Sequence, residues 1–518
     1  MAEIFGKPYL TCVPLPACVK ELRSGTYTST GSVLVIYREE GDAPTFYRFA
    51  TVQDDGSGFH PFFSHDIPTQ PGANGIRFMI FSDGRRILLG DWIVECSPDM
   101  DRCERAELVP LIYPSLDAQS HPNAMRWSEI IVSPSCTHMA WTALNGFDGA
   151  TNRIGRLVRK EDRYILEDVK VISTMDFLVP DEEHPGAIKR GVVRGGELKQ
   201  FIRGGLAVSE AGMAEGTRIA DSVIQELNGE GMYRVTRTCC YDETTIFSPD
   251  ERLGIVMTTR FSPKTNCAVL AWLPRPFMGI SLRGTTLPVY MLSVAAGRSM
   301  PGVNIGPALI DIGRSMNEEL YMGADLSDPE GKWVYHSPMS WHPGSKKAMW
   351  VERTYDNCMD ADKSRLRVVE LPDYEPGEPV PPAEVPDHIP YAADHEQQKP
   401  QQTLKGPVRA VGAFGGTFTL EMDLNGSKSV YDHYCEDGLT TYNGTETFIR
   451  DGAGCTYEAH LEASGQEAGR MNLRLRFAQP NMWSMAQVDF SPAWDGLPAS
   501  YGEVTWQGKT LNVDMMKI

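Results

Sequence analysis

Residues 244–260 read TTIFSPDERLGIVMTTR, and this stretch decides the fold. On both sides of the central Ser-Pro-Asp, apolar and small polar residues alternate with the period of a half-buried β-strand. Ser248, Pro249 and Asp250 favour a tight turn, because proline fixes φ and short polar side chains bond the neighbouring backbone. The stretch therefore predicts two antiparallel strands joined by this turn.

The same pattern of strand, turn and strand occurs three more times along the chain. The three stretches are FMIFSDGRRILLGDW, EIIVSPSCTHMAWTAL and MSWHPGSKKAMWVERT, at residues 78–92, 129–144 and 339–354. Aligned on the turn, the four stretches place these residues in one column: Ser82, Ser133, Ser248 and His342. Repetition of a small unit that only its neighbours can bury is typical of a β-propeller.

The spacing of the turns suggests how many blades the propeller has. The first gap is roughly 50 residues, the length of one four-stranded blade, and the next two are about twice as long. We assign further blades to these segments: 31–52, 156–174 with the Gly-rich stretch after Arg194, and 268–315. We expect six to eight blades, with seven favoured. The best helix candidate, residues 216–229, reads as an insertion in a blade.

The turns resemble the Ser-Pro-Asp-Gly repeats of TolB-type propellers, which also occur in prolyl-oligopeptidase-like proteins. Residues 248–250 match best. The turn at Ser82 lacks the proline, the one at Ser133 lacks the acid and the glycine, and the last has His342 for serine. The resemblance covers residues 77–354 and implies the fold alone, because propellers of this kind range from scaffolds to lyases.

The composition changes after the repeats and indicates two further units. Residues 371–405 are rich in Pro, Glu and Gln, which favours an extended, semi-rigid linker. Residues 406–518 alternate apolar and polar residues between Gly, Asn and Asp, which predicts a small β-barrel or jelly-roll. The expected domains are a propeller over 1–370, the linker over 371–405 and the C-terminal β domain over 406–518.

Charge and composition narrow the range of partners. The net charge of −19 repels polyanions, so we expect no nucleic acid as a partner. The first residues lack a basic start followed by a long apolar core, so we expect no signal peptide, and no apolar run is long enough to span a membrane. The 11 cysteines are widely spread and an odd number, which favours reduced thiols and a cytoplasmic location. The oligomeric state stays open.

Residues just before each turn lie on the innermost strand of a blade, so several of them can meet on the propeller axis. Four to six positions before the turns, and at the exits of the following strands, the sequence carries charged and aromatic residues. The predicted catalytic residues are Arg77, Glu129, Asp242, Glu243 and His336. The predicted substrate-binding residues are Trp127, Arg260, Trp341 and Arg353. Carboxylates and an imidazole that meet at an apolar mouth would suit acid–base catalysis. Salt bridges between blades would use the same residues.

The sequence indicates no cofactor. It contains no nucleophile elbow, no dinucleotide fingerprint and no phosphate-binding loop. No short His-x-His or HExxH spacing supports a divalent metal, although histidines from different blades could still meet. We therefore expect chemistry without a cofactor, and a divalent metal held by such histidines is the alternative.

Three functions remain open from the sequence. The first is an enzyme that performs acid–base chemistry on a small, largely apolar or neutral molecule in the propeller mouth, near the C-terminal barrel. Elimination, isomerisation, cyclisation or hydrolysis would suit such a site, so lyase and isomerase are the leading classes. The second is a non-catalytic interaction scaffold. The third is a carbohydrate lyase or glycosidase, which needs two carboxyl groups at a set separation.

Overall fold

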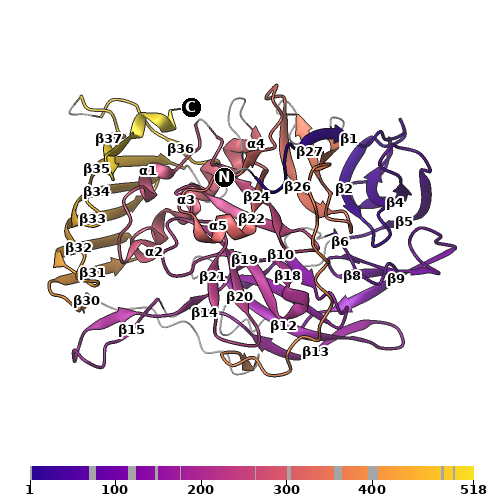
Figure 1. Ribbon diagram of the computed structural model, residues 1–518, viewed down its shortest axis with the longest axis horizontal. Coiled ribbons are helices and arrows are strands. Elements are labelled where there is room, and N and C mark those ends of the chain that lie inside the picture. Colours follow the sequence, from indigo (N-terminus) through magenta and orange to yellow (C-terminus); the bar gives the residue numbers. More distant parts are fainter. Residues whose placement is uncertain are drawn as a thin grey trace.

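The computed structural model describes most of the chain (Figure 1). The described ranges are 3–68, 78–114, 124–145, 150–175, 177–262, 264–299, 305–354, 364–394, 407–479, 484–493 and 496–517. None of the helices in these ranges is long and apolar enough to cross a membrane. The ten described cysteines are free thiols, in agreement with the expectation of reduced cysteines.

The described part contains six blades of four antiparallel strands each; four of the blades are separate sheets, and the second and third are joined into one sheet. Blade 1 has β2 (Glu21–Tyr27), β3 (Val33–Arg38), β4 (Phe46–Val52) and β5 (His60–Asp66). Blade 2 has β6 (Phe78–Ile80), β7 (Arg86–Leu89), β8 (Trp92–Ser97) and β9 (Arg105–Ile112). Blade 3 has β10 (Ala124–Val132), β11 (His138–Asn145), β12 (Ala150–Arg159) and β13 (Tyr164–Val171).

The other three blades complete the ring. Blade 4 has β18 (Gly196–Ile202), β19 (Ala207–Gly212), β20 (Asp221–Glu226) and β21 (Met232–Arg234). Blade 5 has β22 (Asp242–Phe247), β23 (Leu253–Thr258), β24 (Ala308–Asp311) and β25 (Ala324–Asp325). Blade 6 has β26 (Trp333–Trp341), β27 (Lys347–Thr354), β28 (Ser364–Glu370) and, from the start of the chain, β1 (Tyr9–Cys12). Pairing of β1 with β28 closes the ring, with Tyr9 opposite Glu370.

One apolar cluster lies between each pair of neighbouring blades, so stacking of the blades forms the core. Val33 meets Val351 between blades 1 and 6, and Phe49 meets Leu89 between blades 1 and 2. The remaining clusters contain these pairs in order around the ring: Leu88 and Trp141, Ile154 and Val208, Ile224 and Val256, and Ile255 and Trp350. Residues on both faces of each sheet are thereby buried, which explains the run of fully buried strands such as β23.

The propeller fold is as expected, and its six blades lie at the lower end of the expected range. The long gap before Ser248 does hold one additional blade, blade 4. The next gap holds helical turns instead of a seventh blade, because residues 268–299 are inserted between β23 and β24 of blade 5. The expected helix at 216–229 is wrong, since it contains β20, whose residues are buried on both faces. Alternation and burial outweighed its helix-forming residues.

The C-terminal residues form one curved, nine-stranded antiparallel sheet. Its strands are β30 (Val408–Val411), β31 (Thr417–Asp423), β32 (Gly426–Tyr434), β33 (Thr440–Asp451), β34 (Gly454–Gly465), β35 (Gly469–Ala478), β36 (Gln487–Val488), β37 (Tyr501–Trp506) and β38 (Lys509–Asn512). In Figure 1 this sheet (orange to yellow) lies at the opposite side of the molecule from blade 1 (indigo).

The blade 5 insertion packs against the inner face of the C-terminal sheet. The insertion contains α1 (Ala268–Ala271), α2 (Met278–Ser281), η3 (Arg283–Thr285), α3 (Thr286–Tyr290), η4 (Met291–Ala296) and α4 (Gly297–Ser299). Phe277 stacks on Phe418 with ring centroids 3.9 Å apart. Arg275 is fully buried and bonds Glu446 at 2.9 and 3.0 Å. The propeller and the C-terminal sheet therefore share one apolar core.

Residues 371–394 connect the two parts and lie along the propeller. Tyr374 donates a hydrogen bond to Asp250 at 2.6 Å, and the Ala383 amide donates to the carbonyl of Gly204 at 2.8 Å. Strand β29 (Ala393–Asp394) then pairs with β13. The segment thus contacts blades 5, 4 and 3 in turn. The division at 370 and 406 stays a prediction, because residues 395–406 lie outside the described ranges.

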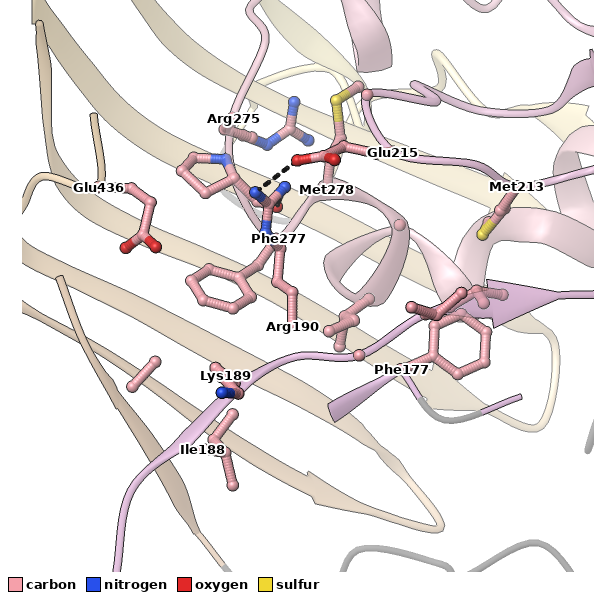
Figure 2. A pocket seen from close by; sticks show the side chains of 18 of the residues that line it. Phe177, Ile188, Lys189, Arg190, Met213, Glu215, Arg275, Phe277, Met278 and Glu436 are labelled. Carbon is pink, nitrogen blue, oxygen red and sulfur yellow. Dashed lines mark hydrogen bonds and ion pairs between the residues drawn. The ribbon is translucent and has the colours of Figure 1, made fainter. Parts of the chain in front are cut away.

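A cavity of about 600 Å³ lies at the junction of the two parts (Figure 2). Its walls come from the hairpin β15 (Leu178–Pro180) and β16 (Ile188–Arg190), from the insertion and from the edge of the C-terminal sheet. Met213 and Phe277 supply apolar surface, and Arg190 pairs with Glu215 at 3.0 Å. The volume suits a small organic molecule, but the mixed walls do not select one chemical class.

Candidate functional site

A β-bulge interrupts the first strand of five blades, at the same step of its pairing with the second strand. These first strands are β2, β10, β18, β22 and β26. The residues inside the bulges are Arg23, 127–129, Lys199, 243–244 and 336–338. A bulge turns side chains out of the regular alternation of a strand, and such bulges occur beside active sites. The repeated bulge therefore directs the side chains of these residues toward the same region of the propeller.

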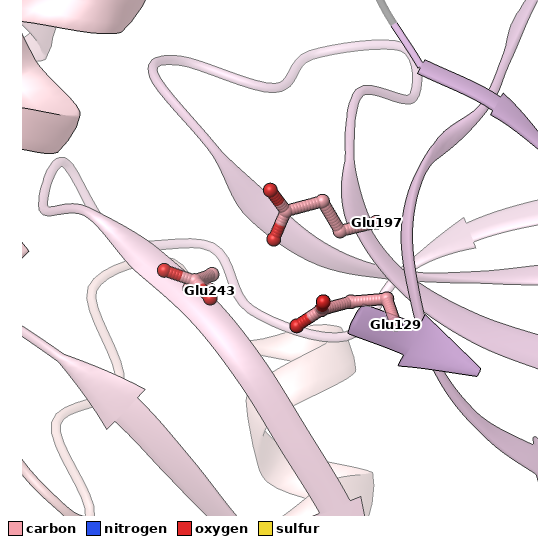
Figure 3. Close-up of side chains that lie close together, drawn as sticks. All are labelled: Glu129, Glu197 and Glu243. Atoms are coloured by element: carbon pink, nitrogen blue, oxygen red, sulfur yellow. The ribbon is translucent and has the colours of Figure 1, made fainter. Parts of the chain in front are cut away.

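Three glutamates from three consecutive blades lie close together (Figure 3), and one lysine lies among them. Lys199 bonds Glu197 at 2.9 Å, Glu243 at 3.1 Å and Glu129 at 3.2 Å. The carboxylate oxygens lie within 4.8 Å of one another. The side chain of Lys199 is 1% exposed and that of Glu197 is 22% exposed, so solvent reaches the cluster from the side of Glu197. We call these four residues the glutamate–lysine cluster.

Burial and charge shift the titration of this cluster. Burial raises the pKa of Glu197 to about 7, and the charges of Glu243 and Glu129 add to it while Lys199 opposes it. For Lys199, burial lowers the pKa, but the three carboxylates outweigh burial and raise it well above its usual value. At neutral pH the lysine is thus charged, and Glu197 exchanges its proton near neutrality.

Two tyrosines border the cluster. The Tyr241 hydroxyl donates a hydrogen bond to Glu243 at 2.9 Å, and burial together with this carboxylate raises the pKa of Tyr241. Tyr290, on α3 of the insertion, makes an edge contact with the ring of Tyr241. Burial raises the pKa of Tyr290, and the charges of Glu243 and Glu197 raise it further. Both phenols therefore stay protonated and act as hydrogen-bond donors.

The structure brings some of the sequence-predicted residues together. Glu129 and Glu243 belong to the glutamate–lysine cluster, and His336 lies in the equivalent bulge of blade 6. Arg353, on β27 beside β26, is buried close enough to His336 to affect its titration. Arg77 lies outside the described residues, and so does the side chain of Trp127.

Other predicted residues have structural contacts instead. Asp242 and Arg260 form a fully buried ion pair with each other at 3.0 Å. Asp242 also accepts a hydrogen bond from Thr238 at 2.6 Å. Trp341 is buried in the core and donates to the Ile246 carbonyl at 2.8 Å. These contacts engage all three side chains within the fold, and their catalytic and substrate-binding roles stay predictions.

Sequence reasoning missed Glu197, Lys199 and Arg23. Their blades lack the Ser-Pro turn, since the turn after β18 is Arg203-Gly204-Gly205, where Gly204 adopts a φ of 71° that favours glycine. The signal was present, because Lys199 stands as far before Gly204 as Glu243 stands before Ser248. A glycine turn used as an additional anchor would have identified it.

The cluster offers oxygen ligands for a metal, but an ammonium already lies among them. Three carboxylates with oxygens within 4.8 Å could hold a divalent ion. Each of the three also accepts a hydrogen bond from Lys199, which satisfies the same negative charge. The donor set alone therefore does not decide between the built-in cation and a metal.

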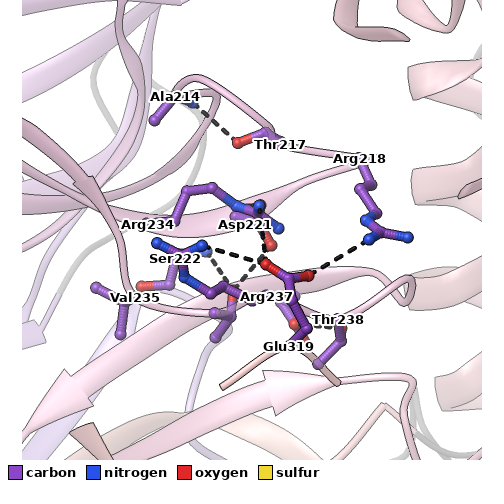
Figure 4. A network of polar contacts seen from close by, with 12 residues as sticks. Ala214, Thr217, Arg218, Asp221, Ser222, Arg234, Val235, Arg237, Thr238 and Glu319 are labelled. Atoms are coloured by element: carbon purple, nitrogen blue, oxygen red, sulfur yellow. Dashed lines mark hydrogen bonds and ion pairs between the residues drawn. The ribbon is translucent and has the colours of Figure 1, made fainter. Parts of the chain in front are cut away.

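A second polar network next to the junction cavity is structural (Figure 4). Glu319 lies among Arg237 at 3.2 Å, Arg218 at 3.3 Å and Arg234 at 3.9 Å. Asp221 accepts from Arg234 at 2.7 Å, and burial raises its pKa to about 6 against the effect of Arg234. These pairs join blade 4 to the loops of blade 5, and neither Glu319 nor Asp221 lines the cavity.

Buried carboxyl groups predict that the folded state loses stability as the pH rises from about 4.5 to 7. Glu210 is fully buried, accepts from Asn152 at 2.7 Å, and has its pKa raised by burial to about 7. The folded state then holds a proton that the unfolded state releases, which favours unfolding at higher pH. We expect Glu210→Gln to gain about 3 kcal/mol relative to the parent between pH 4.5 and pH 8.

Urea unfolding at several pH values measures this effect. The exposed Glu104→Gln substitution is the matched control and should leave the slope of stability against pH unchanged. An equal slope for Glu210→Gln and the parent would show that Glu210 ionises normally in the folded state.

Comparisons with known proteins found distant solved structures and no family. No family model and no curated protein matches the chain. Among solved structures, a TolB from Agrobacterium tumefaciens is similar with a TM-score of 0.34 and 9% identity, over 62% of this chain and 84% of that one. An oligogalacturonate lyase in complex with manganese has a TM-score of 0.34 and 10% identity, over 70% and 93%. A luciferin-regenerating enzyme has a TM-score of 0.34 and 7% identity, over 73% and 99%. At these scores the assignment as a TolB-like β-propeller rests on the blades and turns described above.

Proposed function

We propose that this chain is an enzyme that moves protons on a small organic molecule held on the propeller axis. The observation that carries the proposal is the glutamate–lysine cluster, in which the bulges of three blades bring Glu129, Lys199 and Glu243 together and Glu197 joins them from the start of β18. Elimination and isomerisation are the best-supported reaction types, since both need a carboxylate that accepts a proton from carbon and can return it. Neither needs a redox cofactor.

Glu197 is the proposed proton acceptor. It is the most exposed member of the cluster, and burial with neighbouring carboxylates raises its pKa to about 7, where a general base works best. Lys199 fixes the position of the three carboxylates and keeps their combined charge low. Tyr241 and Tyr290 are protonated donors on the same side and could stabilise negative charge that develops on the substrate.

The geometry gives less support to a glycosidase. That mechanism places a sugar between two carboxyl groups about 5–10 Å apart. Here one oxygen of each carboxylate lies within 4.8 Å of one oxygen of each of the other two, and Lys199 lies among the three groups, where the sugar would have to enter. No contact in the described ranges favours a non-catalytic interaction scaffold over an enzyme. If the chain converts no substrate, the scaffold is the function that remains.

Substitutions in the cluster test the proposal. The purified chain is incubated with a deproteinised small-molecule extract, and mass spectrometry follows compounds that disappear or appear. Glu197→Gln is expected to slow the conversion by at least about 100-fold, because a neutral amide cannot accept the proton. Glu129→Gln and Glu243→Gln are expected to slow it less, and the surface variant Glu104→Gln should match the parent.

The pH dependence of the conversion rate and the effect of a chelator test whether Glu197 or a metal carries the reaction. The parent rate should rise with pH through an apparent pKa near 7, and Glu197→Gln should lose that dependence. Conversion that is equal in the parent and in all three glutamine variants would exclude the cluster as the active site. If a chelator abolishes conversion and Mn²⁺ restores it, the reaction depends on a metal, and the scheme in which Lys199 is the only cation of the cluster is wrong.

A further inference from the structure

The half of the propeller axis opposite the glutamate–lysine cluster is lined by cationic and imidazole side chains. Blades 1 and 6 contribute Arg23 from the bulge of β2, His336 from the bulge of β26 and Arg353 from β27. Arg298 joins them from α4 of the blade 5 insertion. Blades 3, 4 and 5 hold the carboxylates, so charge is separated across the axis.

Helix α4, which carries Arg298, packs against β26, which carries His336, and β27 with Arg353 pairs with β26, so these side chains lie in one region. Burial is the main cause that lowers the pKa of His336 well below the usual value, and the charges of Arg298, Arg353 and Arg23 lower it further. The imidazole is therefore neutral at pH 7, and three guanidinium groups lie near enough to repel its protonated form. A neutral imidazole among guanidinium groups can donate or accept a hydrogen bond without repelling an anion.

Arg298 differs from its neighbours in its pairing. Arg23 bonds Glu21 at 2.6 Å, whereas within the described residues Arg298 has neither an ion pair nor a hydrogen bond from its side chain. The Nε atoms of Arg298 and Arg23 are both buried without an acceptor. Buried donors of this kind are usually satisfied by water or a bound ion. An unpaired, half-buried guanidinium is thus an open position for an anion.

Arg298 also connects the two halves of the axis. Its charge lowers the pKa of Tyr290, the same phenol whose pKa Glu243 and Glu197 raise. Tyr290 and Arg298 lie on the same insertion, and Tyr290 contacts Tyr241, which bonds Glu243. Tyr290 is therefore close to the glutamate–lysine cluster as well as to Arg298. A molecule that spans this distance would place one end on Arg298 and the other beside Glu197.

We propose that Arg298, with His336 and Arg23, binds the carboxylate of a small organic acid whose reacting carbon faces the glutamate–lysine cluster. This inference rests on the proposed function and gives it a substrate class, an organic anion where the sequence suggested a neutral molecule. A guanidinium fork matches a carboxylate and stabilises the charge that develops when a neighbouring carbon loses its proton. Three carboxylates on the same axis repel a dianion more than a monoanion, which favours carboxylate over phosphate.

Binding of a simple anion tests the subsite independently of turnover. The probe is trifluoroacetate, followed by ¹⁹F NMR with the full chain, and acetate and inorganic phosphate are the competitors. We expect saturable binding that acetate displaces and phosphate displaces at least several-fold less well. Arg298→Met should weaken binding at least 10-fold, and Arg298→Lys should restore part of it.

Matched controls separate this site from others. Arg190→Met removes a guanidinium from the junction cavity and should leave trifluoroacetate binding unchanged. Circular dichroism and the melting temperature show that each variant is folded. The proposal is wrong if Arg298→Met binds as the parent does, if Arg190→Met loses binding equally, or if phosphate is the better competitor.

Glu197→Gln distinguishes failure of this inference from failure of the proposed function. It removes a negative charge from the axis but leaves the arginines intact, so it should bind trifluoroacetate at least as tightly as the parent while conversion is lost. Anion binding without any conversion in the parent would refute the enzyme and leave the anion subsite standing. Conversion of organic acids that persists in Arg298→Met with an unchanged KM would refute the subsite alone.

Discussion

Lys199→Met is expected to lower the free energy of unfolding by about 3–5 kcal/mol at pH 8, because it leaves three buried carboxylates without their cation. The ammonium is 1% exposed and bonds all three at 2.9–3.2 Å, so water cannot take its place easily. The loss should shrink as the pH falls toward 5, since protonation of Glu197 removes part of the mutual repulsion. Chemical denaturation at pH 5 and pH 8 measures both values.

Two further variants make the Lys199 result interpretable. Lys160→Met removes a lysine that is 47% exposed and paired with Glu167, and it should cost at most about 1 kcal/mol at either pH. Adding Glu243→Gln to Lys199→Met should recover part of the loss at pH 8, since one repelling charge is gone. A loss that is the same at both pH values would mean that packing of the lysine stem, and not its charge, holds the site together.

Arg275→Met is expected to cost a similar amount, about 3–5 kcal/mol, and to loosen the C-terminal sheet from the propeller. Arg275 lies on the blade 5 insertion, and its side chain is fully buried. It bonds Glu446 at 2.9 and 3.0 Å and the Tyr457 hydroxyl at 2.9 Å, both on the C-terminal sheet. Without Arg275, the carboxylate of Glu446 is buried without a cationic partner, and such an uncompensated charge lowers the stability of the folded state.

Hydrogen exchange and a compensating substitution test this reading of Arg275. Exchange should increase in β31 to β34, which face the insertion, and change little in blades 1 to 3. Because an apolar pair can replace a buried ion pair, Arg275→Met with Glu446→Leu should recover most of the stability. Arg470→Met, at a side chain that is 66% exposed and 3.6 Å from Glu503, is the control. Equal exchange in Arg275→Met and the parent would show that apolar packing alone joins the two parts.

Much of the fold could be predicted because its signals are local. The Ser-Pro turns at Ser133 and Ser248 follow strands with a period of two, and neighbouring residues alone determine both features. The blade count was less certain, because residues 268–299 have a blade's length and an apolar character but fold as helical turns against the C-terminal sheet. That choice depends on a partner surface that lies more than 100 residues away.

The candidate site was predicted only in part for a similar reason. An offset from the turn located Glu129, Glu243 and His336, because each blade repeats the same geometry. It could not separate Glu243 from Asp242, since the bulge that sends one to the axis and the other to Arg260 leaves no mark in the sequence. Lys199 was not predicted because the turn after its strand contains two glycines instead of a Ser-Pro sequence.

Because β1 closes the ring, the propeller cannot be completed until late in translation. Tyr9 pairs with Glu370, so the blades of the nascent chain form an open arc until the sixth blade has been synthesised. The apolar surface around Phe277 is translated well before Phe418, which covers it. At roughly 5–20 residues per second this surface lacks its cover for on the order of 10–30 s, so chaperone binding during synthesis should concentrate on the insertion.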